Sequence, residues 1–241
     1  MSQAAGASGA PQAVSPWLVP RQLGLVDYAE TFAAQKRFTA ERGPSTPDEL
    51  WLLQHPPVYT LGLAGKPEHL LAPSEVPVVH IDRGGQITYH GPGQAVVYLL
   101  IDLARRNLKV REQVRLMEQA MLDVLAAQGV AAERREGAPG VYVKDAKIGA
   151  LGLKISRGCS YHGLSLNVDL DLAPFRRINP CGYEGLASTS LKEQGVATTC
   201  EAILQALAER LTVLLDSDYP FPRARPPERR TPHFCTETRS Q

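Results

Sequence analysis

The sequence predicts a single α+β domain whose sheet is mixed, mainly antiparallel and flanked by helices. Three long segments have helical periodicity, whereas seven shorter segments have the composition of strands. Most of these strands follow one another along the chain with no helix between them. A regular alternation of strand and helix with a wholly parallel sheet is therefore disfavoured. The length of 241 residues suits one large domain.

Helices are predicted over the ranges 27–42, 110–128 and 201–216. The middle helix has the clearest apolar stripe, which includes Met117 and Met121, and Gly129 suits its C-terminal cap.

The other two helices are predicted from their end signals. The first places Phe32, Ala33 and Lys36 at helical spacing and is expected to end at a cap on Gly43. The third is expected to follow a capping box formed by Thr198 and Glu201.

Strands are predicted over the ranges 49–54, 58–63, 78–81, 95–103, 141–143, 147–155 and 164–172. The range 141–155 is expected to form a hairpin that turns at residues 144–146. The last range, LSLNVDLDL, alternates apolar and polar residues, which is typical of a sheet with one face in water.

The composition is that of an ordinary globular protein without a dominant charge. Its 26 basic and 25 acidic residues give a formal net charge of +1, so no global field recruits nucleic acid or an anionic membrane. No apolar run approaches the roughly 18 residues of a membrane span. The first residues lack the features of a secretory signal or a mitochondrial presequence, which predicts a cytoplasmic location.

The two ends of the chain differ from the middle. Residues 1–16 are rich in Ala, Gly, Ser and Pro, and residues 220–241 are rich in Pro and Arg. Both are expected to be flexible tails, although a basic tail could also touch an acidic partner. The range 17–219 is expected to be a single catalytic domain.

The range 82–94, DRGGQITYHGPGQ, is the densest group of glycine and polar residues in the folded part. Glycine lets a backbone approach a ligand closely, and Arg83, His90 and Gln94 could supply directed hydrogen bonds to an otherwise apolar ligand. The alternative is a long hairpin connection. No phosphate-binding loop, HExxH or GxSxG motif is present, so nucleotide-binding, zinc-hydrolase and serine-hydrolase functions have no support.

A second cluster, 147–163, contains the small residues Gly149, Ala150 and Gly152. These residues would leave space over a strand for an extended apolar chain, or would equally allow close sheet packing.

Cys181 is the candidate nucleophile. It lies between Pro180 and Gly182, so a tight turn should present the thiol, and the following backbone N–H groups could face a developing oxyanion. A reactive thiol needs a nearby cation to lower its pKa. The candidate cations are Lys147, Lys154, Arg176 and Arg177, and an inert buried thiol remains the alternative. The four cysteines fit no zinc-site spacing, so no metal is expected.

The motifs in these clusters resemble those of the lipoyl(octanoyl) transferases, also called lipoate–protein ligase B. The matching residues are Arg83-Gly84-Gly85, Thr88-Tyr89-His90, Gln94 with Tyr98, His55-Pro56-Pro57-Val58-Tyr59-Thr60-Leu61-Gly62, Lys147-Ile148-Gly149-Ala150, Gly163-Leu164-Ser165-Leu166-Asn167 and Asn179-Pro180-Cys181-Gly182. They span most of residues 20–215, and no motif position departs from the family pattern. The resemblance implies the fold of the lipoate and biotin ligases, a mixed sheet flanked by helices.

The resemblance also implies site residues. Cys181 would carry an acyl thioester, and Lys147 would act with it. The acyl chain would be bound by Arg83, Gly84, Gly85, Gln86, Ile87, Thr88, Tyr89, His90, Ala150, Leu151, Gly152, Gly163, Leu164 and Ser165. No cofactor is implied.

The implied reaction moves an octanoyl or lipoyl group from octanoyl-acyl carrier protein to a lysine of a lipoyl domain. The acceptors would be the E2 subunits of 2-oxoacid dehydrogenases and the glycine cleavage H protein. Lys147 would lower the pKa of the thiol if it is an ammonium, or would accept a proton if it is neutral. Arg83, Arg176 and Arg177 are candidates for a local basic patch facing the acidic carrier.

Two alternatives stay open. An ATP-dependent lipoate–protein ligase has the same fold but needs no nucleophilic cysteine. Such ligases carry Gly-Gly-Gly followed by His-Asp, whereas this chain has Arg-Gly-Gly and His-Gly, which favours the transferase. A non-catalytic acyl-binding module would keep the apolar groove and tolerate the loss of Cys181.

Overall fold

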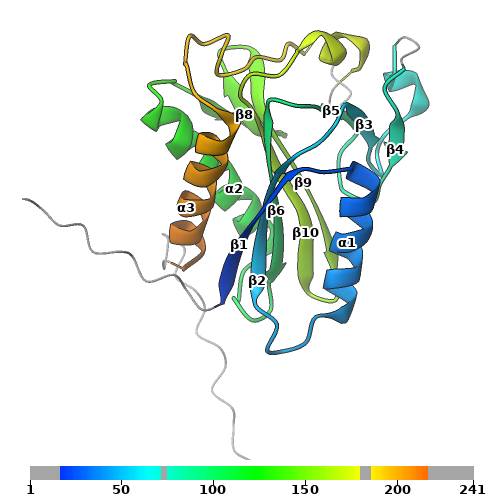
Figure 1. Cartoon of the computed structure of the whole chain (residues 1–241), viewed down its shortest axis with the longest axis vertical. Coiled ribbons are helices and arrows are strands. Elements are labelled where there is room, and N and C mark those ends of the chain that lie inside the picture. The colour runs from blue at the N-terminus through cyan, green and yellow to red at the C-terminus, as the bar shows by residue number, and fades with distance from the viewer. Residues whose placement is uncertain (1–16, 72–74, 180–185, 217–241) are drawn as a thin grey trace, which may run out of the picture.

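The computed structural model describes residues 17–71, 75–179 and 186–216. These residues form one seven-stranded sheet with helices on both faces and a three-stranded sheet beside it (Figure 1). The elements are β1 (Leu18–Leu25), α1 (Tyr28–Glu41), β2 (Asp48–Gln54), β3 (Val58–Leu61), β4 (Val78–His80), β5 (Ile87–His90), β6 (Gln94–Asp102), α2 (Val110–Ala127), β7 (Glu133–Arg135), β8 (Ala138–Val143), β9 (Ala146–Ser156), β10 (Cys159–Asn167) and α3 (Cys200–Asp216), with short 3-10 turns at Pro67–His69 and Ala173–Arg177. The predicted α+β class is confirmed.

The large sheet has the strand order β1-β2-β6-β10-β9-β8-β7, and the small sheet has the order β4-β3-β5. Only the β1–β2 and β3–β4 pairs are parallel, and the other pairs are antiparallel. The sheet is therefore mixed and mainly antiparallel, as predicted.

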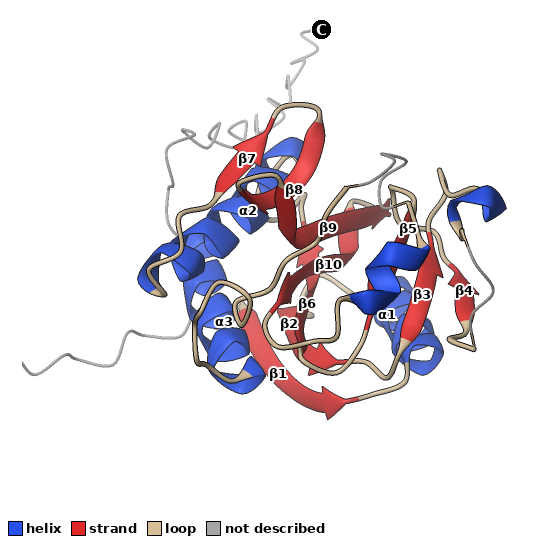
Figure 2. Ribbon diagram, turned by 90° about the horizontal axis from the view of Figure 1, so that it is seen from above, coloured by secondary structure: helices blue, strands red, loops and turns tan. Residues whose placement is uncertain are grey.

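Helices α2 and α3 cover one face of the large sheet, and α1 covers the other (Figure 2). The central strand β6 has apolar residues that pack on both faces of the sheet. Its residues Ala95, Val97 and Leu99 pack toward α2 and α3, whereas Val96 and Tyr98 pack toward α1. A strand buried on both faces needs an unbroken apolar run, which is what β6 has. None of the helices in the described ranges is long and apolar enough to cross a membrane.

The three predicted helices are confirmed, but two of their end signals were wrong. In α1 the buried residues are Tyr28, Thr31, Gln35 and Thr39, and Phe32 is partly buried against the sheet. Polar groups on this face bind the sheet: the side-chain oxygen of Gln35 accepts a hydrogen bond from the backbone N–H of His162 at 2.8 Å.

Two end signals of these helices need correction. Arg42 ends α1 in an extended conformation, so Gly43 is not a left-handed cap. Thr199 caps α3 by accepting a hydrogen bond from Ala202 N at 3.2 Å, in place of the predicted box of Thr198 and Glu201. Gly129, with φ +76°, does close α2.

The predicted strand 164–172 was shifted, because the real strand β10 begins at Cys159 and ends at Asn167. Its alternation does not mark a wet face, since every residue of the strand is buried. The apolar positions Leu164 and Leu166 pack toward α2 and α3, and the small or polar positions face the pocket described below. Strands β1, β5 and β7 were not predicted.

The predicted hairpin is confirmed, since β8 and β9 pair antiparallel around Lys144 and Asp145. The predicted tails fall outside the described residues.

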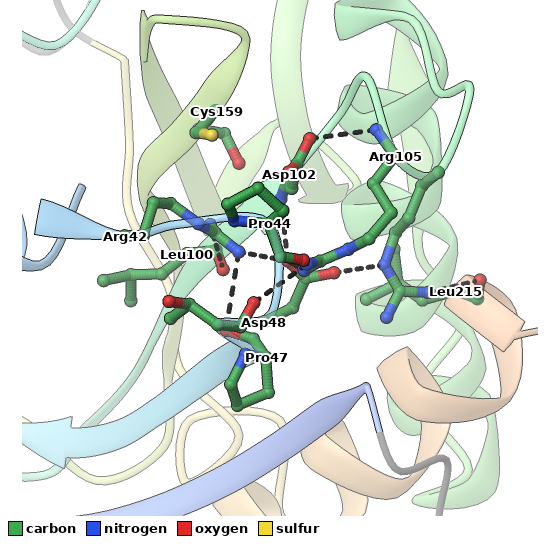
Figure 3. A network of polar contacts seen from close by, with 12 residues as sticks. Arg42, Pro44, Pro47, Asp48, Leu100, Asp102, Arg105, Cys159 and Leu215 are labelled. Atoms are coloured by element: carbon green, nitrogen blue, oxygen red, sulfur yellow. Dashed lines mark hydrogen bonds and ion pairs between the residues drawn. The ribbon is translucent and has the colours of Figure 1, made fainter. Parts of the chain in front are cut away.

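One buried carboxylate holds the end of the sheet where β2 begins (Figure 3). Asp48 is fully buried and contacts three guanidinium groups, from Arg42 at 2.6 Å, Arg105 at 2.6 Å and Arg106 at 2.5 Å. The backbone N–H of Asp102 donates to the same carboxylate at 2.8 Å. The cluster links the end of α1, β2 and the turn after β6.

Candidate active site

A pocket lies over the face of the large sheet that α1 covers. Its floor consists of paired positions on three strands: Gly163 of β10 lies opposite Tyr98 of β6 and Gly152 of β9, and Ser165 lies opposite Val96 and Ala150. Small residues on β9 and β10 leave the floor open. The empty space is about 800 Å³, part of it open to solvent, and its lining is mainly apolar.

The structure brings most of the predicted acyl-binding residues to this pocket. Those that line it are Arg83, Gly85, Gln86, Ile87, Thr88, His90, Ala150, Leu151, Gly152, Gly163, Leu164 and Ser165, together with the predicted catalytic residue Lys147. Gly84 and Tyr89 do not line it. Cys181 lies outside the described residues.

Tyr89 lies in the apolar cluster beside the pocket rather than in its lining. Its ring contacts Tyr59 and Phe175, each with ring centroids 5.5 Å apart. Gly84 pairs its backbone N–H with the carbonyl of Leu153 at 3.1 Å.

The two glycines of the small-residue strand have different roles. A Cβ on Gly152 would lie 2.9 Å from Cδ of Arg83, so this glycine lets Arg83 cross the pocket floor. A Cβ on Gly149 would lie 2.6 Å from Sδ of Met121 on α2, so Gly149 serves helix packing on the other face. The space over each of these glycines is thus taken by a protein side chain, and an acyl chain over this stretch stays a prediction.

Lys147 lies near the start of the same strand, β9, and Gly152 lies near its middle. Lys147 is only 7% exposed. Its backbone N–H donates to the carbonyl of Ala187 at 2.8 Å, and its carbonyl accepts from Thr189 N at 3.0 Å. The segment that follows the gap in the described residues is therefore attached directly beside Lys147.

A directed chain of hydrogen bonds runs from this segment along the pocket. The carbonyl of Thr189 can only accept, so Asn167 donates to it through Nδ2 at 2.9 Å. The Oδ1 atom of Asn167 then accepts from Nε2 of Gln94 at 2.9 Å. The Oε1 atom of Gln94 is left to accept from Nδ1 of His90 at 2.7 Å. A single backbone carbonyl thus sets the orientation of both amides and the tautomer of the histidine.

The chain requires a proton on Nδ1 of His90, and burial keeps the ring neutral. Its Nδ1 carries the proton, so Nε2 faces Thr60 Oγ1 at 3.5 Å as an acceptor. Burial lowers the pKa of His90 to about 3, and the neighbouring His55 contributes in the same direction. His90 therefore acts as a fixed polar wall of the pocket rather than as a cation.

A second histidine is held in the same way. Nδ1 of His55 donates to the carbonyl of Val26 at 2.7 Å, so Nε2 accepts from the hydroxyl of Tyr98 at 2.6 Å. Burial lowers the pKa of His55 to about 4 and raises the pKa of Tyr28 to about 12. The ring of Tyr28 stacks on His90 with centroids 5.6 Å apart. These rings form an uncharged wall on the α1 side.

His162 has an unusual backbone. Its φ of +61° is in the left-handed region, which is costly for a residue with a side chain. Strand alternation would put His162 on the face of Leu164, but the ring instead stacks on Phe32 of α1 with centroids 5.3 Å apart and lines the pocket. Its Nε2 lies 3.0 Å from Oδ1 of Asp82.

This contact between His162 and Asp82 is a hydrogen bond of a neutral imidazole rather than an ion pair. Burial lowers the pKa of His162 to about 4, even though the bond to Asp82 favours protonation. Burial alone would raise the pKa of Asp82, but hydrogen bonds from Tyr161 and His162 outweigh it and lower that pKa.

Arg83 is not part of a surface patch, because it is only 9% exposed. Its guanidinium donates to the carbonyls of Thr60 at 3.1 Å, Gln86 at 2.9 Å and Gly84 at 2.9 Å, and it closes its own loop onto β3. The other two candidates for the basic patch, Arg176 and Arg177, are exposed.

Sequence reasoning assigned no binding role to several residues that line the pocket, namely Tyr28, Val96, Tyr98, Ile148, His162, Asn167, Phe175 and Ser188. Asn167 had a usable signal, since Ser165 and Asn167 alternate with Leu164 and Leu166 at the end of β10. Tyr28 had no such signal. No group of three or more His, Cys, Asp or Glu side chains in the described ranges could hold a metal ion.

Comparisons with known proteins agree with this geometry. Residues 27–212 match the family model described as the lipoyl protein ligase A/B catalytic domain. A protein of Aromatoleum aromaticum named octanoyltransferase is 62% identical over 219 residues, which is 90% of this chain and 94% of that protein. A second octanoyltransferase, from Azoarcus sp. strain BH72, is 61% identical over 88% of this chain and 93% of its own length.

Solved structures support the fold alone, because their identities are low. A lipoate-protein ligase A bound with ATP has a TM-score of 0.66 at 13% identity and covers 82% of this chain and 84% of its own. The biotin protein ligase of Aquifex aeolicus in complex with biotin and ATP has a TM-score of 0.51 at 14% identity and covers 83% of this chain and 71% of its own. The expected likeness to lipoate and biotin ligases is confirmed.

Proposed function

The chain belongs to the lipoyl protein ligase A/B catalytic domain family, and we propose that it is an octanoyltransferase that works through a thioester on Cys181. The donor in this proposal is octanoyl-acyl carrier protein. The acceptor is a lysine of a lipoyl domain, in the E2 subunits of 2-oxoacid dehydrogenases or in the glycine cleavage H protein. The proposal includes a cytoplasmic location and a single catalytic domain over residues 17–219.

One observation carries the proposal: an apolar pocket floor of small residues that has Lys147 at one end. From Lys147 to Gly152 the strand extends by roughly 15 Å, which is longer than an extended octanoyl chain. Two of the polar groups that line this space, His90 and His162, are neutral. An uncharged acyl chain therefore fits the apolar floor beside these histidines, where burial of a charge would cost hydration.

The first step of the proposed reaction is thioester exchange. The Cys181 thiolate attacks the carbonyl carbon of the octanoyl thioester, the new C–S bond forms, and the bond to the carrier sulfur breaks. The carrier leaves as a thiolate and takes up a proton. Bond types on both sides are the same, so the exchange is close to isoenergetic and needs no ATP.

The second step transfers the group to nitrogen. The neutral amine of the acceptor lysine attacks the Cys181 thioester, the C–N bond forms, and the C–S bond to Cys181 breaks. The nitrogen loses one proton, and Cys181 leaves as a thiolate. A cation beside this sulfur favours the thiolate in both steps, which is the role we assign to Lys147.

The relatives support a transferase over the ATP-dependent ligase. Two proteins that are 62% and 61% identical to this chain are named octanoyltransferase, whereas the ligase with a solved structure shares 13% identity.

Intact mass spectrometry tests the proposal. After incubation with octanoyl-acyl carrier protein and no ATP, we expect one octanoyl adduct that hydroxylamine removes. The adduct should be absent in Cys181→Ala and strongly reduced in Lys147→Ala. Labelling that requires ATP and free acid would favour the ligase and overturn the proposal. Octanoylation of a lipoyl domain by Cys181→Ala at the normal rate would show that Cys181 is not the nucleophile, and binding without transfer would indicate an acyl-binding module.

A further inference from the structure

The β8–β9 hairpin contains an irregularity beside Lys147. Val141 lies opposite Gly149, but the next residue, Tyr142, lies opposite Lys147. One residue of β9, Ile148, is therefore extra, which is the defining feature of a β-bulge.

The bulge decides which face of the sheet Lys147 occupies. In an unbroken strand, Lys147 would share the face of Gly149, whose Cβ position faces Met121 of α2. The extra residue reverses this alternation. Lys147 accordingly lies on the pocket side with Tyr142, while Val141 and Val143 pack toward α2.

On that face the lysine side chain runs over two residues of β8. Nζ of Lys147 lies over the ring of Tyr142, 5.4 Å from its centroid. The ring itself is 1% exposed, and its hydroxyl donates to the carbonyl of Ala138 at 3.2 Å. A face of an aromatic ring attracts a cation, and the attraction is stronger when water is excluded.

Gly140 provides the space for the rest of the side chain. It lies two residues before Tyr142 and so on the same face. A Cβ there would lie 2.6 Å from Cε and 3.2 Å from Nζ of Lys147. Gly140 also has φ +129°, and its backbone N–H donates to the buried Glu118 of α2 at 3.1 Å.

We propose that Gly140 and Tyr142 are positioning residues that hold the Lys147 ammonium on the pocket side of the sheet, with the β9 bulge setting its direction. The ring of Tyr142 holds the ammonium of Lys147 from one side. The absence of a side chain on Gly140 leaves room for the aliphatic part of the lysine side chain. Glu118 holds the backbone of Gly140 in place. This inference rests on the proposed function, in which Lys147 favours the thiolate of Cys181.

The pH dependence of Cys181 alkylation tests this inference. The measured quantity is the midpoint, the pH at which the alkylation rate is half its maximum, and a purely structural role of Gly140 and Tyr142 would not change it. The full-length protein is treated with iodoacetamide at a series of pH values, and the Cys181 peptide is quantified by mass spectrometry. An opposite charge within about 4–6 Å shifts a pKa by about 1–3 units. We expect Lys147→Ala to raise the midpoint by at least one unit, and Tyr142→Leu to raise it by at least half as much.

Matched variants separate the ring from other effects. Tyr142→Phe keeps the aromatic face and loses only the hydroxyl, so it should restore most of the wild-type midpoint. Gly140→Ala should raise the midpoint, whereas Gly43→Ala should not, because a Cβ on Gly43 has no heavy atom within 4 Å and its φ is not left-handed. If Gly140→Ala fails to fold, as judged by circular dichroism, the two Tyr142 variants decide.

The outcomes distinguish the two proposals. A wild-type midpoint in Tyr142→Leu, combined with a shifted midpoint in Lys147→Ala, would overturn the positioning role alone. An equal shift in Tyr142→Phe and Tyr142→Leu would also overturn it, since the ring would not be the cause. An unshifted midpoint in Lys147→Ala would instead contradict the role of Lys147 in the proposed function.

Discussion

Replacing Asp48 by Asn removes one negative charge from the point where three guanidinium groups converge. The Asp48 side chain is fully buried, and those of Arg42 and Arg106 are only 4% and 9% exposed. Asn has nearly the same shape, so the substitution leaves no cavity. It removes the carboxylate that binds the buried Arg42 and leaves Arg106 with the partly exposed Asp216.

The expected cost follows from this burial. Breaking a buried ion pair by removing one partner destabilises a protein by about 3–5 kcal/mol, because the other charge stays buried and unpaired. For a domain of 150–250 residues, each kcal/mol lowers Tm by about 2–4 °C. Asp48→Asn should therefore lower Tm by roughly 6–20 °C.

Urea unfolding followed by circular dichroism measures the loss, and Asp216→Asn is the matched control. Asp216 binds the same Arg106 at 3.2 Å but is 31% exposed, so its removal should cost less than about 1 kcal/mol. The octanoyl-transfer rate per folded molecule should be unchanged in Asp48→Asn, because the cluster does not line the pocket. A loss below about 1 kcal/mol for Asp48→Asn, or equal losses for the two variants, would refute the reasoning.

Three further predictions concern the pocket. The pKa of His90 is lowered to about 3 from its ordinary value of 6.5, so the stability associated with its neutral form is present above pH 6.5 and is lost as the pH falls toward 3, by about 1.4 kcal/mol at pH 5.5. Nitrogen-15 NMR at that pH should show a neutral ring protonated on Nδ1; a charged ring would contradict the lowered pKa, and a neutral ring protonated on Nε2 would contradict the direction of the hydrogen-bond chain. Asn167→Leu should lower the free energy of unfolding by roughly 1–3 kcal/mol, because it leaves the carbonyl of Thr189 unsatisfied. It should also lower kcat more than it changes KM. An unchanged kcat would mean that the hydrogen-bond chain does not position the segment beside Lys147. Gly152→Val should push against Arg83 and fill the far end of the pocket, so transfer should shift from octanoyl toward hexanoyl thioesters, and an unchanged preference would place the acyl chain elsewhere.

The main elements were predictable because their signals are local. The apolar stripe of α2 and the continuous apolar run of β6 each fix an element from its own residues. Strand β1 was missed because nearly all its residues are exposed and its pairing with β2 is what makes it a strand. Strand β5 was missed because its four residues lie inside a glycine-rich segment that reads as a loop.

The residues of the site could be predicted from the motifs, but the direction in which each side chain points could not. Spacing alone cannot show that Tyr89 faces Phe175 while His90 faces the pocket, since this depends on where β5 begins. Alternation along β9 would even have put Lys147 on the wrong face, because the bulge at Ile148 arises from pairing with β8. The left-handed backbone of His162 could not be predicted either, because histidine usually avoids this conformation and nothing in the sequence marks it.

The Asp48 cluster also bears on how the ends of the described part of the chain can be joined. Asp48 N–H donates to the carbonyl of Trp17 at 2.9 Å, and Arg106 binds the carbonyl of Leu215 at 3.0 Å. The first and last described residues are thus tied to one spot, at the lower end of the molecule in Figure 1. Ends that lie close together can be connected by a short linker without straining the fold. A circularly permuted chain that joins residues 17 and 216 there should leave the pocket face clear.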